Sequence, residues 1–182
     1  KLTPLIDASA IAERVAELGR RITHDYLGRE LVIVPVLKGS YVFAADLGRH
    51  IDLDISIDFL GVRSYGDGQE SSGAVRITHD LSHSIEGKHV ILVEDIVDTG
   101  LTVSYLQHNL VTRNPASLKV ASLLHKPSRT EVPVDIDYLG LVTLDFCQLL
   151  QHPRTNRHVD LLLHHTKIVC PPSSQLPNPS NQ

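Results

Sequence analysis

The sequence is poor in several features, and each scarcity excludes a class of protein. Two cysteines in 182 residues, Cys147 and Cys170, are too few for a disulfide framework, so we expect a reducing, cytoplasmic setting. No apolar run approaches the roughly 20 residues of a membrane span. The first residues lack the apolar core of a secretory signal, and because they include no initiator methionine we expect a few residues to precede them. The net charge is −4, so no basic excess favours a nucleic-acid partner.

What is present fits one globular domain with an ordinary core. Hydrophobic residues make up 42 % of the chain and charged residues 21 %. Apolar residues recur at helical spacing in some segments and form continuous or alternating runs in others. Helices are predicted at about 9–23, 41–50 and 103–110, and strands at 31–37, 53–59, 75–77, 90–93, 118–124 and 134–139. This alternation predicts an α/β fold with right-handed βαβ units around a mainly parallel sheet.

Three segments are expected to differ from this regular core. Pro35 is placed near the end of its strand, because proline cannot donate to a central ladder. Residues 61–73 hold four glycines and three serines and are predicted to form a long mobile loop. We expect a single domain over 1–168 and a disordered tail over 169–182, which is rich in proline and serine.

The most informative segment is 90–102. An apolar run ends in Glu94, Asp95 and Asp98, and a Thr-Gly-x-Thr turn then opens a helical pattern. Ligands of an open parallel sheet sit outside the carboxyl ends of its strands. Carboxylates accept hydrogen bonds from ribose hydroxyls and bind Mg²⁺, and the N–H groups of a helix start hold phosphate. The order of these parts predicts a sugar-phosphate site, whereas a solvated acidic loop with a helix cap is the plainer alternative.

The segment 93–102, Val-Glu-Asp-Ile-Val-Asp-Thr-Gly-Leu-Thr, resembles the phosphoribosyl pyrophosphate (PRPP) motif of type I phosphoribosyltransferases. Its adjacent acids make it most similar to the hypoxanthine-guanine branch. The segments 36–40, 63–73 and 118–126 resemble that family's pyrophosphate loop, its flexible catalytic loop and the strand that delivers a purine-reading lysine. The resemblance implies the type I phosphoribosyltransferase fold, Mg²⁺ as cofactor and a homodimer or homotetramer. It implies a purine salvage enzyme that converts PRPP and a 6-oxopurine, hypoxanthine or guanine, into IMP or GMP and pyrophosphate.

The resemblance also implies roles for individual residues. Asp98 would act beside the purine N7 as general base, and Ser64 and Tyr65 would close over the site. Glu94 and Asp95 would hold the ribose hydroxyls, directly or through Mg²⁺. The residues implied to bind the 5′-phosphate are Asp98, Thr99, Gly100, Leu101 and Thr102. The residues implied to bind pyrophosphate are Leu37, Lys38 and Gly39, and in the family this turn contains a non-proline cis peptide. The residues implied to contact the purine are Ile96, Lys126 and Phe146.

The sequence departs from the family pattern after about residue 140. Only Arg154 and Asp160 could replace the family's later arginine and metal-binding aspartate. Two explanations stay open, a divergent working C-terminus and an altered reading of the gene such as a frameshift. The alternative functions are an inactive or regulatory PRPP-binding homologue with a damaged purine half-site and a xanthine-preferring transferase. The histidines of 152–165 match no metal-binding spacing.

Overall fold

The computed structural model describes residues 3–64, 75–142 and 167–170, and helices and strands alternate along them. The helices are α1 (Ala8–Asp25), α2 (Tyr41–Arg49) and α3 (Leu101–Val111), with a 3-10 turn at Pro127–Arg129. The strands are β1 (Thr3–Asp7), β2 (Leu31–Leu37), β3 (Ile55–Ile57), β4 (Leu60–Ser64), β5 (Val75–His79), β6 (His89–Val97), β7 (Ser117–His125), β8 (Tyr138–Val142) and β9 (Lys167–Cys170). Within these residues no helix combines the length and the apolar character that a membrane crossing requires.

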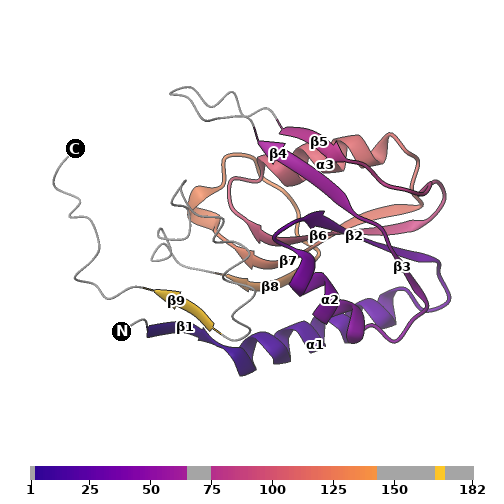
Figure 1. Ribbon diagram of the computed structural model, residues 1–182. Helices are drawn as coiled ribbons and strands as arrows, with labels where there is room; N and C mark the ends of the chain where they lie inside the picture. Colours follow the sequence, from indigo (N-terminus) through magenta and orange to yellow (C-terminus); the bar gives the residue numbers. More distant parts are fainter. Residues whose placement is uncertain (1–2, 65–74, 143–166, 171–182) are drawn as a thin grey trace.

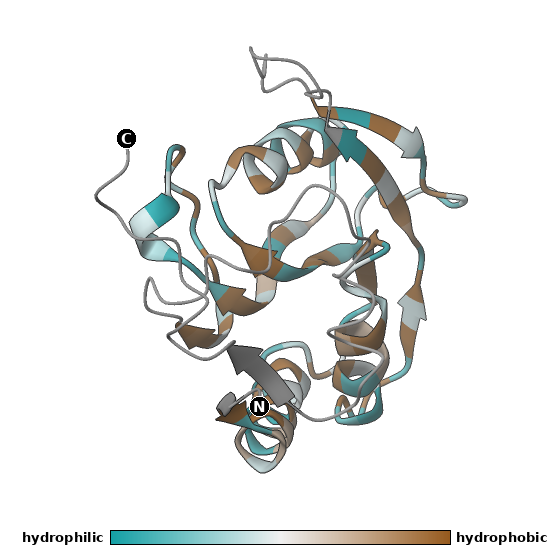
Figure 2. Cartoon of the chain, turned by 60° about the vertical axis from the view of Figure 1, so that its left-hand side comes forward, coloured by the Kyte–Doolittle hydropathy of each residue, from teal (hydrophilic) through white to brown (hydrophobic). Residues whose placement is uncertain are grey.

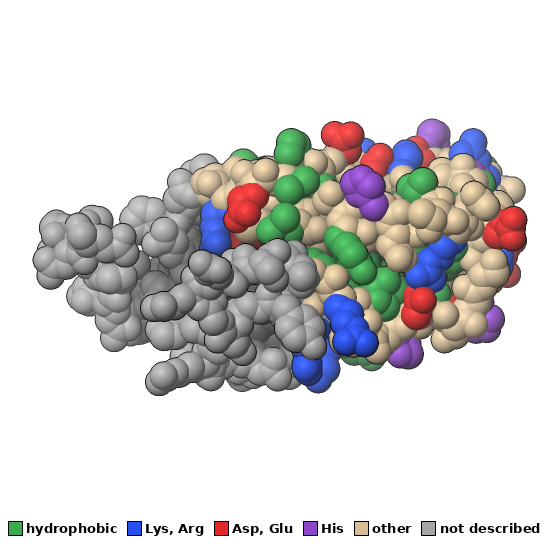
Figure 3. Space-filling view, turned by 90° about the horizontal axis from the view of Figure 1, so that it is seen from above, with side chains coloured by type: hydrophobic (Ala, Val, Ile, Leu, Met, Phe, Trp, Pro, Cys, Tyr) green, Lys and Arg blue, Asp and Glu red, His purple; other side chains and the backbone are tan. Residues whose placement is uncertain are grey.

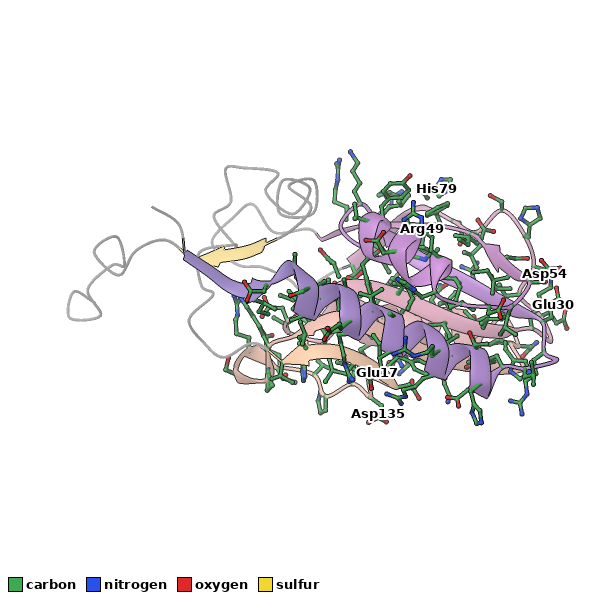
Figure 4. All side chains as sticks on the ribbon, turned by 90° about the horizontal axis from the view of Figure 1, so that it is seen from below. Glu17, Glu30, Arg49, Asp54, His79 and Asp135 are labelled. Carbon is green, nitrogen blue, oxygen red and sulfur yellow. The ribbon has the colours of Figure 1, made fainter. Side chains whose placement is uncertain are left out.

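One sheet organises the molecule (Figure 1). Its strands follow the order β5-β4-β2-β6-β7-β8, and β3 pairs with the first half of β2. Neighbouring strands are parallel except β4 and β5, which are antiparallel, so the predicted mainly parallel sheet is confirmed. β1 pairs with β9 in a separate antiparallel ladder. In Figure 4, Glu30 and Asp54, which precede β2 and β3, mark the end of the molecule where these parallel strands begin. The carboxyl ends of the strands therefore lie at the opposite end.

Helices cover both faces of the sheet. Alternate residues of a strand point to opposite sides. On one side Ile33 and Ile91 pack with α1 and α2, and on the other Val34 and Leu92 pack with α3. Strands that are buried on both faces need continuous apolar runs, which explains the runs that the sequence shows there. Figure 2 accordingly shows apolar residues gathered on the central strands.

Pro35 lies in β2 two residues before its last residue, Leu37, and thus near the end of the strand as predicted. Along one edge, β2 pairs with β3 through its residues 31–33 and with β4 only from Val36 onward. The carbonyl of Ile33 accepts the N–H of Asp58, which directly follows β3. The odd-numbered residues of β2 therefore direct their backbone N–H and C=O groups toward β3 and β4. Pro35 therefore faces the interval between β3 and β4, where its missing N–H removes no ladder hydrogen bond.

Two predicted strand boundaries are wrong. The alternating pattern over 53–59 predicted one strand, but β3 and β4 are separate, and β4 takes the first residues of the predicted loop 61–73. The strand predicted at 134–139 begins later, at Tyr138, and joins the sheet beside β7. Residues 169 and 170 belong to β9, whereas loop residues 65–74 and tail residues 171–182 lie outside the described part of the chain.

A buried carboxylate explains the break between β3 and β4. Asp58 is 8 % exposed and accepts the backbone N–H groups of Phe59, Ser82 and His83 at 2.9, 2.7 and 3.0 Å. Burial alone would raise the pKa of this carboxyl, but the hydrogen bonds from the three N–H groups lower the pKa below its ordinary value. Asp58 thus bends the chain and ties it to the segment that follows β5.

Candidate functional site

Three turns at one edge of the sheet bring together most of the predicted site residues. The turns are residues 37–40, 98–100 and 126–129, and they follow β2, β6 and β7. These strands are parallel neighbours, so their carboxyl ends lie side by side although they are distant in sequence. Open α/β sheets bind ligands at this position.

The turn after β2 is pressed against the acids of β6. The peptide between Leu37 and Lys38 is cis, as the resemblance implies. The buried Ser40 hydroxyl donates to a carbonyl of β2 at 2.7 Å, which fixes the turn on its strand. A Cβ at Gly39 would overlap the Asp95 carboxylate. A larger residue at position 39 would therefore require the Asp95 side chain to move.

Glu94 and Asp95 occupy the last part of β6 itself, and both are partly buried. Burial raises the pKa of the Glu94 carboxyl well above its ordinary value, and the charge of Asp95 raises it further. The fold therefore disfavours the ionised form of Glu94. A cation beside the two carboxylates would reverse that preference, because opposite charge favours ionisation.

The chemistry of this carboxylate pair fits a divalent cation such as Mg²⁺. Protein-bound Mg²⁺ usually takes one or two carboxylates and completes its shell with water and substrate phosphates. Within residues 3–64, 75–142 and 167–170 no group of three or more His, Cys, Asp or Glu side chains is arranged to hold a metal.

The turn after β6 leads directly into α3. Gly100 has φ +84° and is the N-cap of this helix, which has no side-chain cap hydrogen bond. Thr99 Oγ1 accepts the N–H of Leu101 at 3.4 Å, and the Val132 carbonyl occupies the space that a Cβ at Gly100 would need. The first N–H groups of a helix have no partner within it, so they and the partly buried Thr102 can serve a phosphate.

A third element, the 126–132 segment, holds this turn from outside. The Lys126 N–H donates to the carbonyl of the last residue of β6 at 2.9 Å. The N–H groups of Glu131 and Val132 both donate to the Thr99 carbonyl, each at 2.9 Å. Lys126 itself is 3 % exposed. The conformation of the turn after β6 thus depends on backbone donors that follow β7.

Asp98 faces an arginine of the same segment. Arg129 Nε lies 3.2 Å from Asp98 Oδ1, and the two side chains are 42 % and 15 % exposed. Arg129 ends the 3-10 turn that starts just after Lys126. Sequence reasoning missed this residue, and the only signal for it was an arginine in a short turn next to a predicted site lysine.

The remaining predicted residues are placed as follows. Ile96 is half-buried and packs against the core beneath α1 and α2. Ser64 is the last residue of β4, which neighbours β2. Tyr65 and Phe146, together with Arg154 and Asp160, lie outside the described residues. On the face drawn in Figure 3, basic and acidic side chains are interspersed, and no large basic patch is visible.

Comparison with known proteins identifies the family to which this chain belongs. A model of the phosphoribosyl transferase domain matches residues 4–147, and the chain belongs to this family. The predicted family and its α/β fold are thereby confirmed.

Proteins similar to this chain include several that are named hypoxanthine or hypoxanthine-guanine phosphoribosyltransferase. The hypoxanthine-guanine phosphoribosyltransferase of Mycobacterium tuberculosis is 45 % identical over 142 residues, which are 75 % of this chain and 70 % of that one. The protein of that name from Dictyostelium discoideum is 50 % identical over 134 residues, or 71 % and 74 % of the two chains. The crystal structure of a hypoxanthine phosphoribosyltransferase from Staphylococcus aureus superposes with a TM-score of 0.75 at 41 % identity, covering 79 % and 78 %.

Proposed function

We propose that the chain is a purine salvage enzyme that transfers the phosphoribosyl group of PRPP to hypoxanthine or guanine. One observation carries the proposal. The acidic pair, the helix-opening turn and the 37–40 turn converge at one sheet edge, with Gly39 against Asp95. This convergence supports a ligand with a phosphate at one end, ribose hydroxyls in the middle and pyrophosphate at the other end. The names of the similar proteins support a 6-oxopurine as acceptor.

In the proposed reaction the C1′–O bond to pyrophosphate breaks, a C1′–N bond to the purine forms, and the purine loses a proton. Asp98 accepts that proton through a hydrogen bond from the purine, and Lys126 donates to the purine O6. The turn of 99–102 holds the 5′-phosphate, and Lys38 and Gly39 bind the departing pyrophosphate. Most of the rate enhancement then comes from positioning and from stabilising the charge that grows on pyrophosphate. Ser64 and Tyr65 exclude water when they close over the reactants.

Glu94 and Asp95 hold the ribose hydroxyls and would also hold Mg²⁺. When bound, this cation neutralises part of the pyrophosphate charge. The position of Glu94 beside Asp95 toward the end of β6 supports the assignment, because a cation there would offset the burial that raises the pKa of the Glu94 carboxyl.

A second candidate is a PRPP-binding homologue that does not transfer the sugar. It is favoured by the end of the family match at residue 147, before Arg154 and Asp160, which would have to replace the family's later arginine and metal-binding aspartate. A xanthine-preferring transferase is the third, because a lysine that donates to O6 serves any 6-oxopurine.

The test is release of pyrophosphate from Mg-PRPP with hypoxanthine, guanine, xanthine or adenine in turn. The proposed enzyme releases it with the first two and not with adenine. Calorimetric binding of Mg-PRPP without release would identify the non-transferring homologue. Release with xanthine alone would identify the third candidate.

Asp98→Asn separates chemistry from binding. We expect turnover to fall by about 10²-fold or more, as for loss of a positioned base, while the PRPP dissociation constant changes little. Asp80→Asn is the matched control, because Asp80 also pairs with an arginine but lies after β5, away from the site. Collapse of PRPP binding with normal turnover per bound PRPP would contradict the role of Asp98.

We also propose that the protein acts in the cytoplasm as a homodimer or homotetramer. The scarcity of cysteine supports the location. Light scattering after size-exclusion chromatography measures the assembly, and a purely monomeric mass would contradict it.

A further inference from the structure

We infer that Arg129 is a positioning residue that fixes the Asp98 carboxylate for proton transfer, an inference that rests on the proposed function. Neither the sequence pattern nor the family resemblance assigned any role to Arg129. The pair is defined by Arg129 Nε and Asp98 Oδ1, which lie 3.2 Å apart. Asp98 is largely shielded from solvent, which strengthens an ion pair relative to one in water.

The backbone around Arg129 makes this contact more than a chance meeting of surface side chains. Arg129 N–H donates to the Lys126 carbonyl at 3.2 Å, which closes the 3-10 turn. On either side of it the 126–132 segment is attached to the turn after β6, through Lys126 N–H to Val97 O and through two N–H groups to Thr99 O. Arg129 thus approaches Asp98 from a segment whose two ends are bonded to the residues before and after Asp98.

The chemistry of the two groups suits positioning. An ionised carboxylate offers about four acceptor sites, so the ion pair with Arg129 leaves acceptor sites for a hydrogen bond from a purine N–H. Arginine stays charged at any working pH and holds its N–H groups in a rigid plane, so it orients a carboxylate more tightly than lysine does. The same segment carries Lys126, so a single element would set both the proton acceptor and the purine donor.

The test compares Arg129→Gln and Arg129→Lys with the wild-type protein in the pyrophosphate-release assay. We expect kcat of Arg129→Gln to fall about tenfold, part of the roughly 10²–10⁴ that a positioned acid or base contributes. PRPP affinity should stay within about twofold, since Arg129 leaves the phosphate turn attached through backbone bonds. Arg129→Lys should recover part of the loss because it keeps the charge.

A double-mutant cycle distinguishes positioning from a general structural role. Once Asp98→Asn has removed the proton acceptor, Arg129→Gln should lower kcat little further. Arg113→Gln is the matched control, because Arg113 pairs with Asp80 at 2.8 Å beyond the far end of α3 and should leave kcat unchanged. Full additivity in the cycle, or equal losses of kcat and PRPP affinity, would overturn the inference.

A measurement independent of turnover keeps the contact testable if the proposed function fails. The NMR resonance of the Asp98 carboxyl carbon, assigned through Asp98→Asn, should shift in Arg129→Gln and not in Arg113→Gln. An unshifted resonance overturns the Arg129–Asp98 contact. A wild-type protein that releases no pyrophosphate with any purine overturns the proposed function, and with it the positioning role.

Discussion

Gly100→Ala tests whether the contact between the turn after β6 and the 126–132 segment shapes the site. Gly100 has φ +84°, a conformation that residues with a Cβ adopt at a cost. In addition, its Cβ would overlap the carbonyl oxygen of Val132, which belongs to the backbone and cannot rotate away. The substitution therefore combines a local strain with a displacement of the neighbouring segment.

The two contributions can be separated by a matched control. A left-handed conformation costs a non-glycine residue roughly 1–2 kcal/mol. Overpacking against a fixed neighbour adds about 1–3 kcal/mol, so we expect Gly100→Ala to lower the free energy of unfolding by about 2–5 kcal/mol. Gly28 has φ +73° with nothing within 4 Å of its Cβ position. Gly28→Ala should therefore show only the conformational part.

Urea unfolding of both variants measures the two free energies, and titration with Mg-PRPP measures binding. Gly100→Ala should weaken PRPP binding, because the Thr99 carbonyl and the 126–132 segment must separate, whereas Gly28→Ala should bind normally. Equal losses of stability in the two variants, with PRPP binding intact in both, would refute the view that the Val132 contact shapes the phosphate turn.

Three further predictions concern single side chains. Asp58 has a lowered pKa, so its contribution to stability is complete above the unfolded value of about 3.9 and is lost as pH falls through the folded value. Urea midpoints from pH 7 to pH 3 should therefore fall more for the wild-type protein than for Asp58→Asn, which keeps the lowered pKa values of Glu17, Asp25 and Asp80 and should be less stable at pH 7. Glu94 has a raised pKa, so its ionisation opposes folding at pH 7. Glu94→Gln should therefore raise the free energy of unfolding measured without Mg²⁺, and it should weaken the binding of Mg-PRPP measured by calorimetry. A loss of stability in this variant would contradict the burial effect. Lys126→Ala should raise KM for the base several-fold with nearly unchanged PRPP affinity in steady-state assays, and equal losses for both substrates would argue against a purine contact.

Sequence reasoning identified the parts of the fold that depend on local patterns. The helical spacing over 9–23 corresponds to α1, and the apolar run before Glu94 corresponds to the buried part of β6. The order of acids, threonines and glycine predicted that a strand ends there and a helix begins, and β6 and α3 meet at this segment, because that order depends on one strand and the helix after it.

Features that depend on distant residues were mispredicted or missed. Pro35 is tolerated inside β2 because the neighbouring strand changes at that point, which no local pattern reveals. The break at Asp58 depends on N–H groups more than twenty residues away. Arg129 became a candidate only when the 126–132 segment was seen folded onto the turn that holds Asp98.

The division of the site among separate strands has an evolutionary consequence. On the proposed function, the donor sugar phosphate is held by the turns after β2 and β6, whereas the acceptor base meets the short segment after β7. The core lies beneath these turns and is built from the strands themselves. After gene duplication, side-chain substitutions in segment 126–132 can then alter contacts to the base, whereas its backbone bonds to Val97 and Thr99 must be kept to preserve the donor turn.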